Sequence, residues 1–138
     1  MKVVAIGTGY VGLVTGVCYA SLGLEVVCLD IDADKIARLQ AGHSPIFEPG
    51  LEERMAQAVR AGNLSFSTNY GESLEGADVA IIAVGTPTEE GGSKANTSFV
   101  EAAFSSLIDT RLRAKQSASP AKPAMQPLTV VVKSTVPI

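Results

Sequence analysis

The sequence predicts an α/β fold in which helices cover both faces of a parallel β-sheet. Three observations support this prediction. Strand-like apolar runs alternate with helix-like segments, a glycine-rich turn follows the first run directly, and an acidic residue ends the second run. Such alternation is typical of parallel strands joined by crossover helices, with a ligand crevice at the carboxyl ends of the strands.

The first strand and helix meet at the glycine-rich turn. Residues 2–6 read K-V-V-A-I, and residues 7–12 read G-T-G-Y-V-G. Gly7 permits a tight turn, Gly9 lets the backbone approach a pyrophosphate, and Gly12 lets the following helix pack closely on the strand. Free N–H groups and the positive dipole end of that helix favour phosphate binding.

The second strand, at residues 25–29, ends in Asp30, roughly twenty residues beyond the glycines as a dinucleotide-binding fingerprint requires. An acidic side chain there accepts hydrogen bonds from an adenosine ribose and repels a 2′-phosphate, so NAD is favoured over NADP. The alternative is that Asp30 is only a turn residue, with Asp32 as the N-cap of the next helix. Together with the glycines, Asp30 indicates a Rossmann-type, doubly wound sheet.

The remaining elements follow from periodicity and capping signals. Asp32 caps a helix through residue 41 with Ile36 and Leu39 inward, and a capping box of Ser98 and Glu101 opens a helix that reaches about Leu112. A further helix is predicted over residues 51–61, and strands over residues 64–67, 79–84 and 129–133. Right-handed crossovers then give the sheet order 3-2-1-4-5, with the crevice between strands 1 and 4.

The apolar stretch up to residue 24 has the superficial look of a signal peptide or membrane segment. Glycines and Thr15 interrupt it, and no Ala-x-Ala cleavage pattern closes it. We therefore predict no membrane partner. Gly12, Gly16 and Ala20 fall on one helical face, which predicts a helix that lies close to the sheet.

Composition limits the remaining function classes. A chain of 138 residues with 46% apolar residues fits one globular domain. A formal net charge of −3 gives no support for a nucleic-acid partner. Cys18 and Cys28 lack metal or redox spacing, so we expect no metal site and interpret both as small buried hydrophobes in a reducing, cytoplasmic compartment.

Two segments are predicted to lie outside regular structure. Residues 86–96 contain Pro87, Gly91 and Gly92 and are expected to form a mobile loop after the fourth strand. Residues 117–127 are rich in Pro, Ala and Ser and are expected to be a solvated connector, with anion binding as the alternative.

Several strings occur in a fixed order: G-Y-V-G-L at residues 9–13, Asp30 with Lys35, S-P-I-F-E-P-G-L at 44–51, V-G-T-P at 84–87 and K-S-T-V-P at 133–137. Over its whole length the chain resembles the amino-terminal domain of the UDP-glucose/GDP-mannose dehydrogenase family. Members oxidise the C6 alcohol of a nucleotide sugar to a carboxylate with two NAD⁺, through a thioester on a cysteine. The string at 133–137 is more similar to the UDP-glucose enzymes than to the GDP-mannose ones.

The resemblance implies roles for individual residues. It assigns residues 7–12 to the pyrophosphate, with the Val11 backbone among the contacts, and Asp30 and Lys35 to the adenosine ribose. Thr86 would line the cofactor cleft, and Thr135 would lie near the nicotinamide and help to hold a catalytic water. The complete set of expected cofactor-binding residues is Gly7, Thr8, Gly9, Tyr10, Val11, Gly12, Asp30, Lys35, Thr86 and Thr135. Lys35 as a solvated helix residue, and Thr86 and Thr135 as turn residues, remain alternatives.

The family's cysteine nucleophile, lysine and aspartate belong to a later part of the protein, and the nucleotide-sugar substrate needs a second domain. Neither Cys18 nor Cys28 is expected to be that nucleophile, and we assign no catalytic role to His43 or Glu48. We therefore expect residues 1–138 to be one NAD-binding domain, a fragment truncated before a sixth strand and inactive alone. The full-length protein is expected to be a homo-oligomer.

Local departures from the family and other function classes also remain. Residues 95–97 read A-N-T where the family usually has an acidic residue, and the Pro-rich connector is unusually long. A stand-alone NAD-binding regulatory module would bind NAD without needing a second domain. A hydroxyacid dehydrogenase or an FAD-dependent protein would not usually carry the strings at 84–87 and 133–137 together. The same domain of a GDP-mannose enzyme is the nearest alternative.

Overall fold

The computed structural model describes residues 1–87, 95–117 and 126–134. Within them, a five-stranded parallel sheet has the order β3-β2-β1-β4-β5, which confirms the predicted fold class and order. The strands are β1 (Lys2–Ile6), β2 (Glu25–Leu29), β3 (Leu64–Ser67), β4 (Val79–Ile82) and β5 (Thr129–Val132).

The predicted ends of the last two strands differ slightly from the observed ones. β4 and β5 end two residues and one residue before the expected limits of 84 and 133. Backbone pairing nevertheless continues, since Ala83 N donates to Ile6 O at 2.8 Å and Lys133 N donates to Ile82 O at 2.7 Å. The carboxyl ends of β1, β4 and β5 are therefore held in register.

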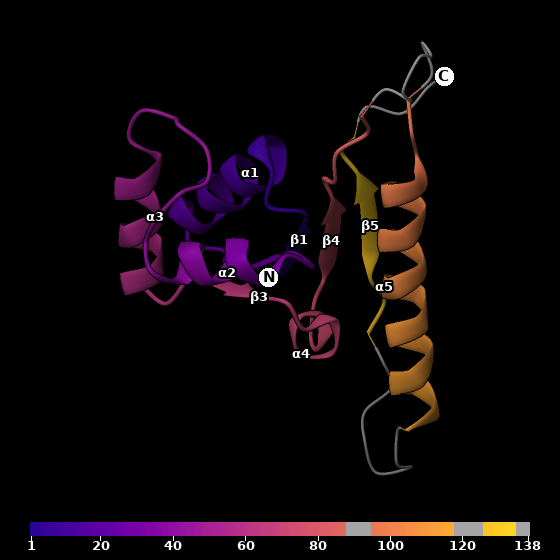
Figure 1. The fold of residues 1–138 in the computed structure, drawn as a ribbon. Helices are drawn as coiled ribbons and strands as arrows, with labels where there is room; N and C mark the ends of the chain where they lie inside the picture. The colour runs from indigo at the N-terminus through magenta and orange to yellow at the C-terminus, as the bar shows by residue number, and fades with distance from the viewer. Residues whose placement is uncertain (88–94, 118–125, 135–138) are drawn as a thin grey trace.

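Helices cover both faces of the sheet. α1 (Tyr10–Ser21), α2 (Ala33–Gln40) and α3 (Leu51–Arg60) pack on one face, and α4 (Tyr70–Leu74) and α5 (Ser98–Gln116) on the other. Figure 1 shows α5 beside β5 at one side of the molecule and α3 at the opposite side. The crossover connections thus produce the layers expected of a doubly wound sheet.

The core consists of two clusters separated by the sheet. On β1, Val3 and Ala5 belong to the cluster beneath α1, α2 and α3, and Val4 and Ile6 belong to the cluster beneath α4 and α5. Alternate side chains point to opposite faces of a strand, and both faces of a parallel sheet are apolar. This explains why β1 reads as a continuous apolar run.

Two glycines bring α1 close to the strands, as predicted. A Cβ added at Gly12 would lie 1.9 Å from the carbonyl oxygen of Gly7, and one at Gly16 would lie 2.5 Å from Cys28 Sγ. The expectation that Cys18 is buried is wrong, because Cys18 is exposed whereas Cys28 is buried. α1 is apolar on nearly every side, so its sequence pattern does not mark the solvent face.

The helix termini confirm some capping predictions and correct others. Asp32 Oδ1 accepts the Lys35 N–H at 3.0 Å, and Ile36 and Leu39 are buried, as predicted for α2. α4 is an element that our sequence reading missed. Its N-cap is Asn69, whose side chain accepts from Gly71 N and Glu72 N.

The capping box predicted at Ser98 is wrong. Thr97 is the N-cap of α5, and the Asn96 side chain accepts the Ser98 N–H at 2.9 Å, in a local turn that competes with the box. Glu101 instead accepts the Thr97 hydroxyl at 2.8 Å. α5 continues to Gln116, beyond the predicted end near Leu112.

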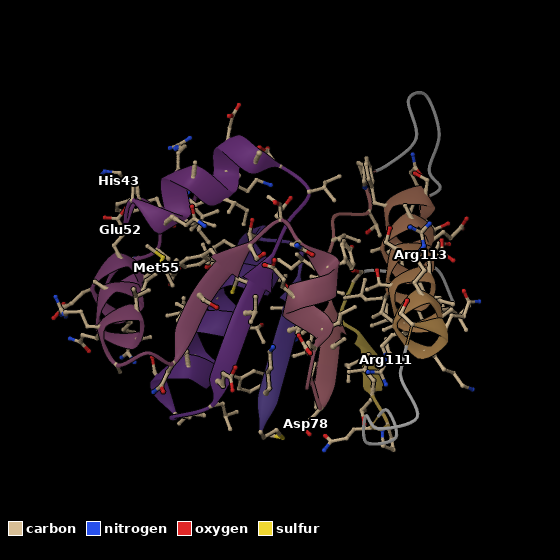
Figure 2. All side chains as sticks on the ribbon, turned by 90° about the horizontal axis from the view of Figure 1, so that it is seen from below. His43, Glu52, Met55, Asp78, Arg111 and Arg113 are labelled. Atoms are coloured by element: carbon tan, nitrogen blue, oxygen red, sulfur yellow. The ribbon has the colours of Figure 1, made fainter. Side chains whose placement is uncertain are left out.

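A hydrogen bond joins the amino ends of β1 and β4. Lys2 N donates to Asp78 Oδ2 at 2.7 Å, and Asp78 lies just before β4 (Figure 2). The glycine-rich turn and Asp30 lie at the other end of the strands, the carboxyl end. Most of the predicted mobile loop and of the Pro-rich connector lies outside the described residues, at 88–94 and 118–125.

Candidate dinucleotide-binding site

A cleft of about 570 Å³ opens at the carboxyl ends of β1, β2 and β4. Its volume is typical of a site for a small molecule or cofactor, about 300–1,000 Å³. The polar end of its lining includes Gly9, Asp30 and Lys35, and the apolar wall includes Val84 and Phe99. The location is the topological switch point, where the chain passes from the β1-β2-β3 side to β4.

The three glycines of the glycine-rich turn have different structural roles. Gly7 has a φ of +98°, which side-chain-bearing residues rarely adopt, and its N–H donates to Leu29 O at 2.7 Å. Gly12 packs against Gly7. Gly9 has an ordinary φ of −73°, and a Cβ added there would meet nothing within 4 Å. The backbone at Gly9 is therefore the part of the turn that is open to a ligand.

The amino end of α1 fits a bound phosphate. Gly9 is the N-cap and supplies no side-chain hydrogen bond, and the first turn carries no acidic residue. The first amides of the helix have no intrahelical partner, and the helix dipole makes this end positive. The open space at Gly9 and these amides together fit a pyrophosphate group.

Asp30 is a buried anion at the polar end of the cleft, next to the glycine-rich turn. Its Oδ2 accepts from Thr8 N at 2.8 Å, from Thr8 Oγ1 at 2.6 Å and from Lys35 Nζ at 3.2 Å. Its Oδ1 accepts from Asp32 N at 3.1 Å. The structure thus brings together Asp30 and Lys35, the two residues expected at the adenosine ribose.

The pKa values around Asp30 favour an ionised acceptor beside a neutral donor. Burial raises the pKa of Asp30, but hydrogen bonds from Thr8, Asp32 and Lys35 outweigh it, so the pKa lies below the usual value of 3.8. Burial and then the charge of Asp30 raise the pKa of Tyr70, on α4. At neutral pH the cleft therefore presents a carboxylate that can accept hydrogen bonds from hydroxyl groups, and its lining also includes the protonated phenol of Tyr70.

The loop between α2 and α3 reaches the start of α1. The exposed Tyr10 hydroxyl donates to the Glu48 carboxylate, and this hydrogen bond together with the negative charge raises the pKa of Tyr10. Glu52 accepts the Ser44 N–H at 2.9 Å, and Figure 2 shows His43 near Glu52. His43 is exposed and does not line the cleft.

The other expected site residues have different surroundings. Thr8 is fully buried behind Asp30, and Val11 is exposed at the first turn of α1. Thr86 is half-buried between Gly85 and Pro87, both of which line the cleft. Thr135 lies outside the described residues, which end at Ser134.

Our reading of the sequence did not include the helical part of the cleft lining. Tyr70 comes from α4, and Phe99, Ala102 and Ser106 come from α5. The spacing of Phe99, Ala102 and Ser106 is that of one helical face, and this is the signal that was available. Their facing the cleft depends on how α5 packs, which the local pattern does not specify.

The described parts of the chain have neither a metal-ligand cluster nor a membrane-spanning helix. There, no group of three or more His, Cys, Asp or Glu side chains is arranged to hold a metal ion. In the same residues, no helix has the length and apolarity needed to cross a membrane.

The parallel sheet, the open glycine turn and the carboxylate at the end of β2 define a dinucleotide-binding domain of the Rossmann class. Comparison with known proteins identifies the family. The model of the NAD-binding domain of the UDP-glucose/GDP-mannose dehydrogenase family matches residues 1–138, and the chain belongs to that family. Its cofactor is NAD.

Individual relatives agree with this assignment. The chain is 45% identical to a UDP-glucose 6-dehydrogenase of Rhizobium meliloti and 44% identical to UDP-glucose 6-dehydrogenase YwqF of Bacillus subtilis. Both alignments cover 100% of this chain, but only 29% and 28% of the relatives. The chain therefore spans less than a third of the length of these oxidoreductases.

Solved structures show the same fold. A UDP-glucose dehydrogenase from Pyrobaculum islandicum matches with a TM-score of 0.84 at 40% identity. A GDP-mannose dehydrogenase from Pseudomonas aeruginosa matches with a TM-score of 0.85 at 32% identity. Each match covers 99% of this chain and 29% of the solved chain.

Proposed function

We propose that this chain is the cofactor-binding part of an enzyme that oxidises UDP-glucose to UDP-glucuronate with two NAD⁺. The observation that carries the site assignment is the ionised Asp30, fixed at the end of β2 in the same cleft as the open backbone of Gly9. The preference for UDP-glucose is supported by relatives of that name at 45% and 44% identity over the whole chain. A GDP-mannose 6-dehydrogenase of Pseudomonas syringae is 40% identical over 92 residues.

The lining of the cleft suggests which residues bind each part of the cofactor. The amides at the start of α1 would bind the pyrophosphate, and Asp30 with Lys35 would bind the adenosine ribose. The apolar wall that includes Phe99 and Ala102 would lie against the adenine. When bound, NAD⁺ supplies the hydride acceptor. We assign Thr86 to the lining of the cofactor cleft and Thr135 to the nicotinamide, where it would help to hold a water.

The nucleophile of the reaction would come from outside these residues. The chain has two cysteines. Burial raises the pKa of Cys28 to about 12, which keeps it a thiol, and it lies in the core beneath α1. Cys18 is exposed on α1 and does not line the cleft. Since the reactive species is a thiolate at the substrate, neither residue fits that role. The nucleotide-sugar site and homo-oligomer assembly are likewise assigned to the whole protein.

Titration calorimetry tests the cofactor site. We expect NAD⁺ to bind more tightly than NADP⁺, and Asp30→Ala to lose about 1–3 kcal/mol of binding free energy, the range for a charged hydrogen-bond partner. Gly9→Val is expected to abolish binding while the fold persists, because its side chain would occupy the open space over the turn. Equal or tighter binding of NADP⁺ would overturn the ribose assignment.

Enzyme assays test the substrate. The pure 138-residue chain with NAD⁺ and UDP-glucose is expected to give no sustained NADH. In the whole enzyme that we propose, NADH formation should depend on UDP-glucose. Dependence on GDP-mannose would favour the second candidate function, the cofactor-binding part of a GDP-mannose dehydrogenase. The similar TM-scores of the two solved enzymes support testing it. Sustained NADH from the chain alone would mean that the chemistry is carried by residues assigned here to structure.

A further inference from the structure

Thr8, the second residue of the glycine-rich turn, directs both of its donors at one atom. Its side chain is fully buried, and a buried hydroxyl is costly unless it is hydrogen-bonded. Its Oγ1 donates to Asp30 Oδ2 at 2.6 Å, and its N–H donates to the same oxygen at 2.8 Å. The two residues are 22 positions apart, so the contact links the turn after β1 to the end of β2.

The two carboxylate oxygens of Asp30 accept different numbers of hydrogen bonds. Oδ2 accepts both Thr8 donors and Lys35 Nζ, at 3.2 Å. Within the described residues, Oδ1 accepts from Asp32 N alone, at 3.1 Å. A carboxylate oxygen offers about two lone-pair sites. Oδ2 is therefore saturated by the protein, whereas Oδ1 retains the capacity to accept another hydrogen bond.

We propose that Thr8 is a positioning residue for NAD, whose two donors fix the rotation of the Asp30 carboxylate so that Oδ1 accepts the adenosine ribose hydroxyl. This inference rests on the proposed ribose-binding role of Asp30 and adds the group that orients it. The hydroxyl also stabilises the ionised form of Asp30, which can only accept hydrogen bonds. Thr8 would thus act on the cofactor through Asp30 and not by touching it.

Two substitutions separate the hydroxyl from the shape of the side chain. Thr8→Val keeps the branched shape and removes the hydroxyl, and we expect it to weaken NAD⁺ binding about tenfold at pH 7. Thr8→Ser keeps the hydroxyl and should bind within about twofold of the parent chain. Thr129→Val, at an exposed threonine on β5, is the matched control and should leave the affinity unchanged. If Thr8 only packs the turn, Val will bind like the parent and Ser more weakly, which would overturn the proposal.

The pH dependence gives a readout that packing alone would not move. The Thr8 hydroxyl helps to hold the pKa of Asp30 below 3.8, so its removal raises that pKa and moves the acid loss of NAD⁺ binding to higher pH. Among the described residues, the ionisable groups near Asp30 are Lys35, Tyr70 on α4, and Asp32, whose backbone N–H donates to Asp30. Because Asp32 is also a carboxylate, the titration is read at the Asp30 carboxyl carbon by NMR. An unchanged midpoint in Thr8→Val would contradict the proposal.

Further variants keep the test decisive. Thermal melts check folding, and Thr8→Ala replaces Thr8→Val if the latter does not fold. Asp30→Asn that binds NAD⁺ as tightly as the parent would overturn the ribose assignment itself. Weak binding by Asp30→Asn with tight binding by Thr8→Val would overturn only the role of Thr8. In the Asp30→Asn background we expect Thr8→Val to have little further effect, because the two residues act as one unit.

Discussion

The two edges of the sheet differ in how completely they are covered. On the β3 side, the edge strand β3 buries Leu64 and Phe66 in the core cluster to which Leu13 and Val17 of α1 also belong. On the β5 side, Val131 and Val132 are 42% and 46% exposed. The cleft has polar lining residues from the closed β3 side, such as Asp30 and Lys35, and apolar ones from α5, such as Phe99 and Ala102. Figure 1 shows α5 beside β5, on the open side. The polar groups that we propose to recognise the cofactor therefore lie mainly on the closed side.

The largest expected contrast between the two sides comes from one substitution made in both. Leu13 on α1 is fully buried, and Leu112 on α5 is 51% exposed. Leu13→Ala should lower the free energy of unfolding by about 2–5 kcal/mol, because it leaves a cavity in the core. Leu112→Ala should change it by about 0.5 kcal/mol or less. Urea titrations followed by circular dichroism measure both, and similar losses would show that the open side is as tightly packed as the closed one.

A smaller effect is expected where α1 touches the turn. The Cβ of Gly12→Ala would meet the Gly7 carbonyl oxygen, which is backbone and cannot swing away. We expect the variant to lose about 3 kcal/mol of stability, the upper end for overpacking. Gly9→Ala is the matched control in the same turn, since its Cβ meets nothing within 4 Å. Equal melting temperatures for the two variants would contradict the close approach of α1.

The closed side was also the more predictable from sequence. Glycines at positions 7 and 12, and the cap at Asp32, are local signals whose structural outcome is fixed by nearby backbone geometry. The start of α5 was mispredicted because the Asn96 side chain accepts the Ser98 N–H, which the Glu101 side chain would accept in a capping box. α4 was missed although Asn69 and Glu72 have the spacing of a cap followed by an acidic third residue.

The site was predictable in its polar part only. Asp30 follows an apolar run at the expected distance from the glycines, so its place at the cleft was inferable. Thr8 as its partner was not inferred, because the contact joins two turns that only the folded sheet brings together. Phe99 and Ser106 line the cleft through the packing of a helix far along the chain, a tertiary outcome that a local pattern does not encode.

The exposed edge strand β5 predicts self-association of the chain, which one added lysine on that strand should weaken. β5 lies at the end of the sheet order, and exposed edge strands rich in valine pair readily with other chains. Val132→Lys should reduce concentration-dependent self-association in sedimentation velocity runs, with little change in stability. Val59→Lys is the matched control, since Val59 is 45% exposed on α3, at the opposite side (Figure 1). Equal effects of the two lysines would show that net charge, and not the β5 edge, controls association.

The smallest expected effect lies at the rim of the closed side, where Tyr10 contacts Glu48. The hydrogen bond to Glu48 and its negative charge raise the pKa of Tyr10, because both favour the protonated phenol. Glu48→Ala removes both causes and should lower the pKa of Tyr10, as read from the pH midpoint of tyrosinate absorbance. Glu48→Gln removes the charge but keeps an acceptor, so its shift should be smaller. Glu52→Gln is the control, because Glu52 binds Ser44 N in the same loop and should leave the midpoint unmoved. If Glu48→Ala also left the midpoint of Tyr10 unmoved, Glu48 would not contact Tyr10 in solution. The loop between α2 and α3 would then not be held against the start of α1.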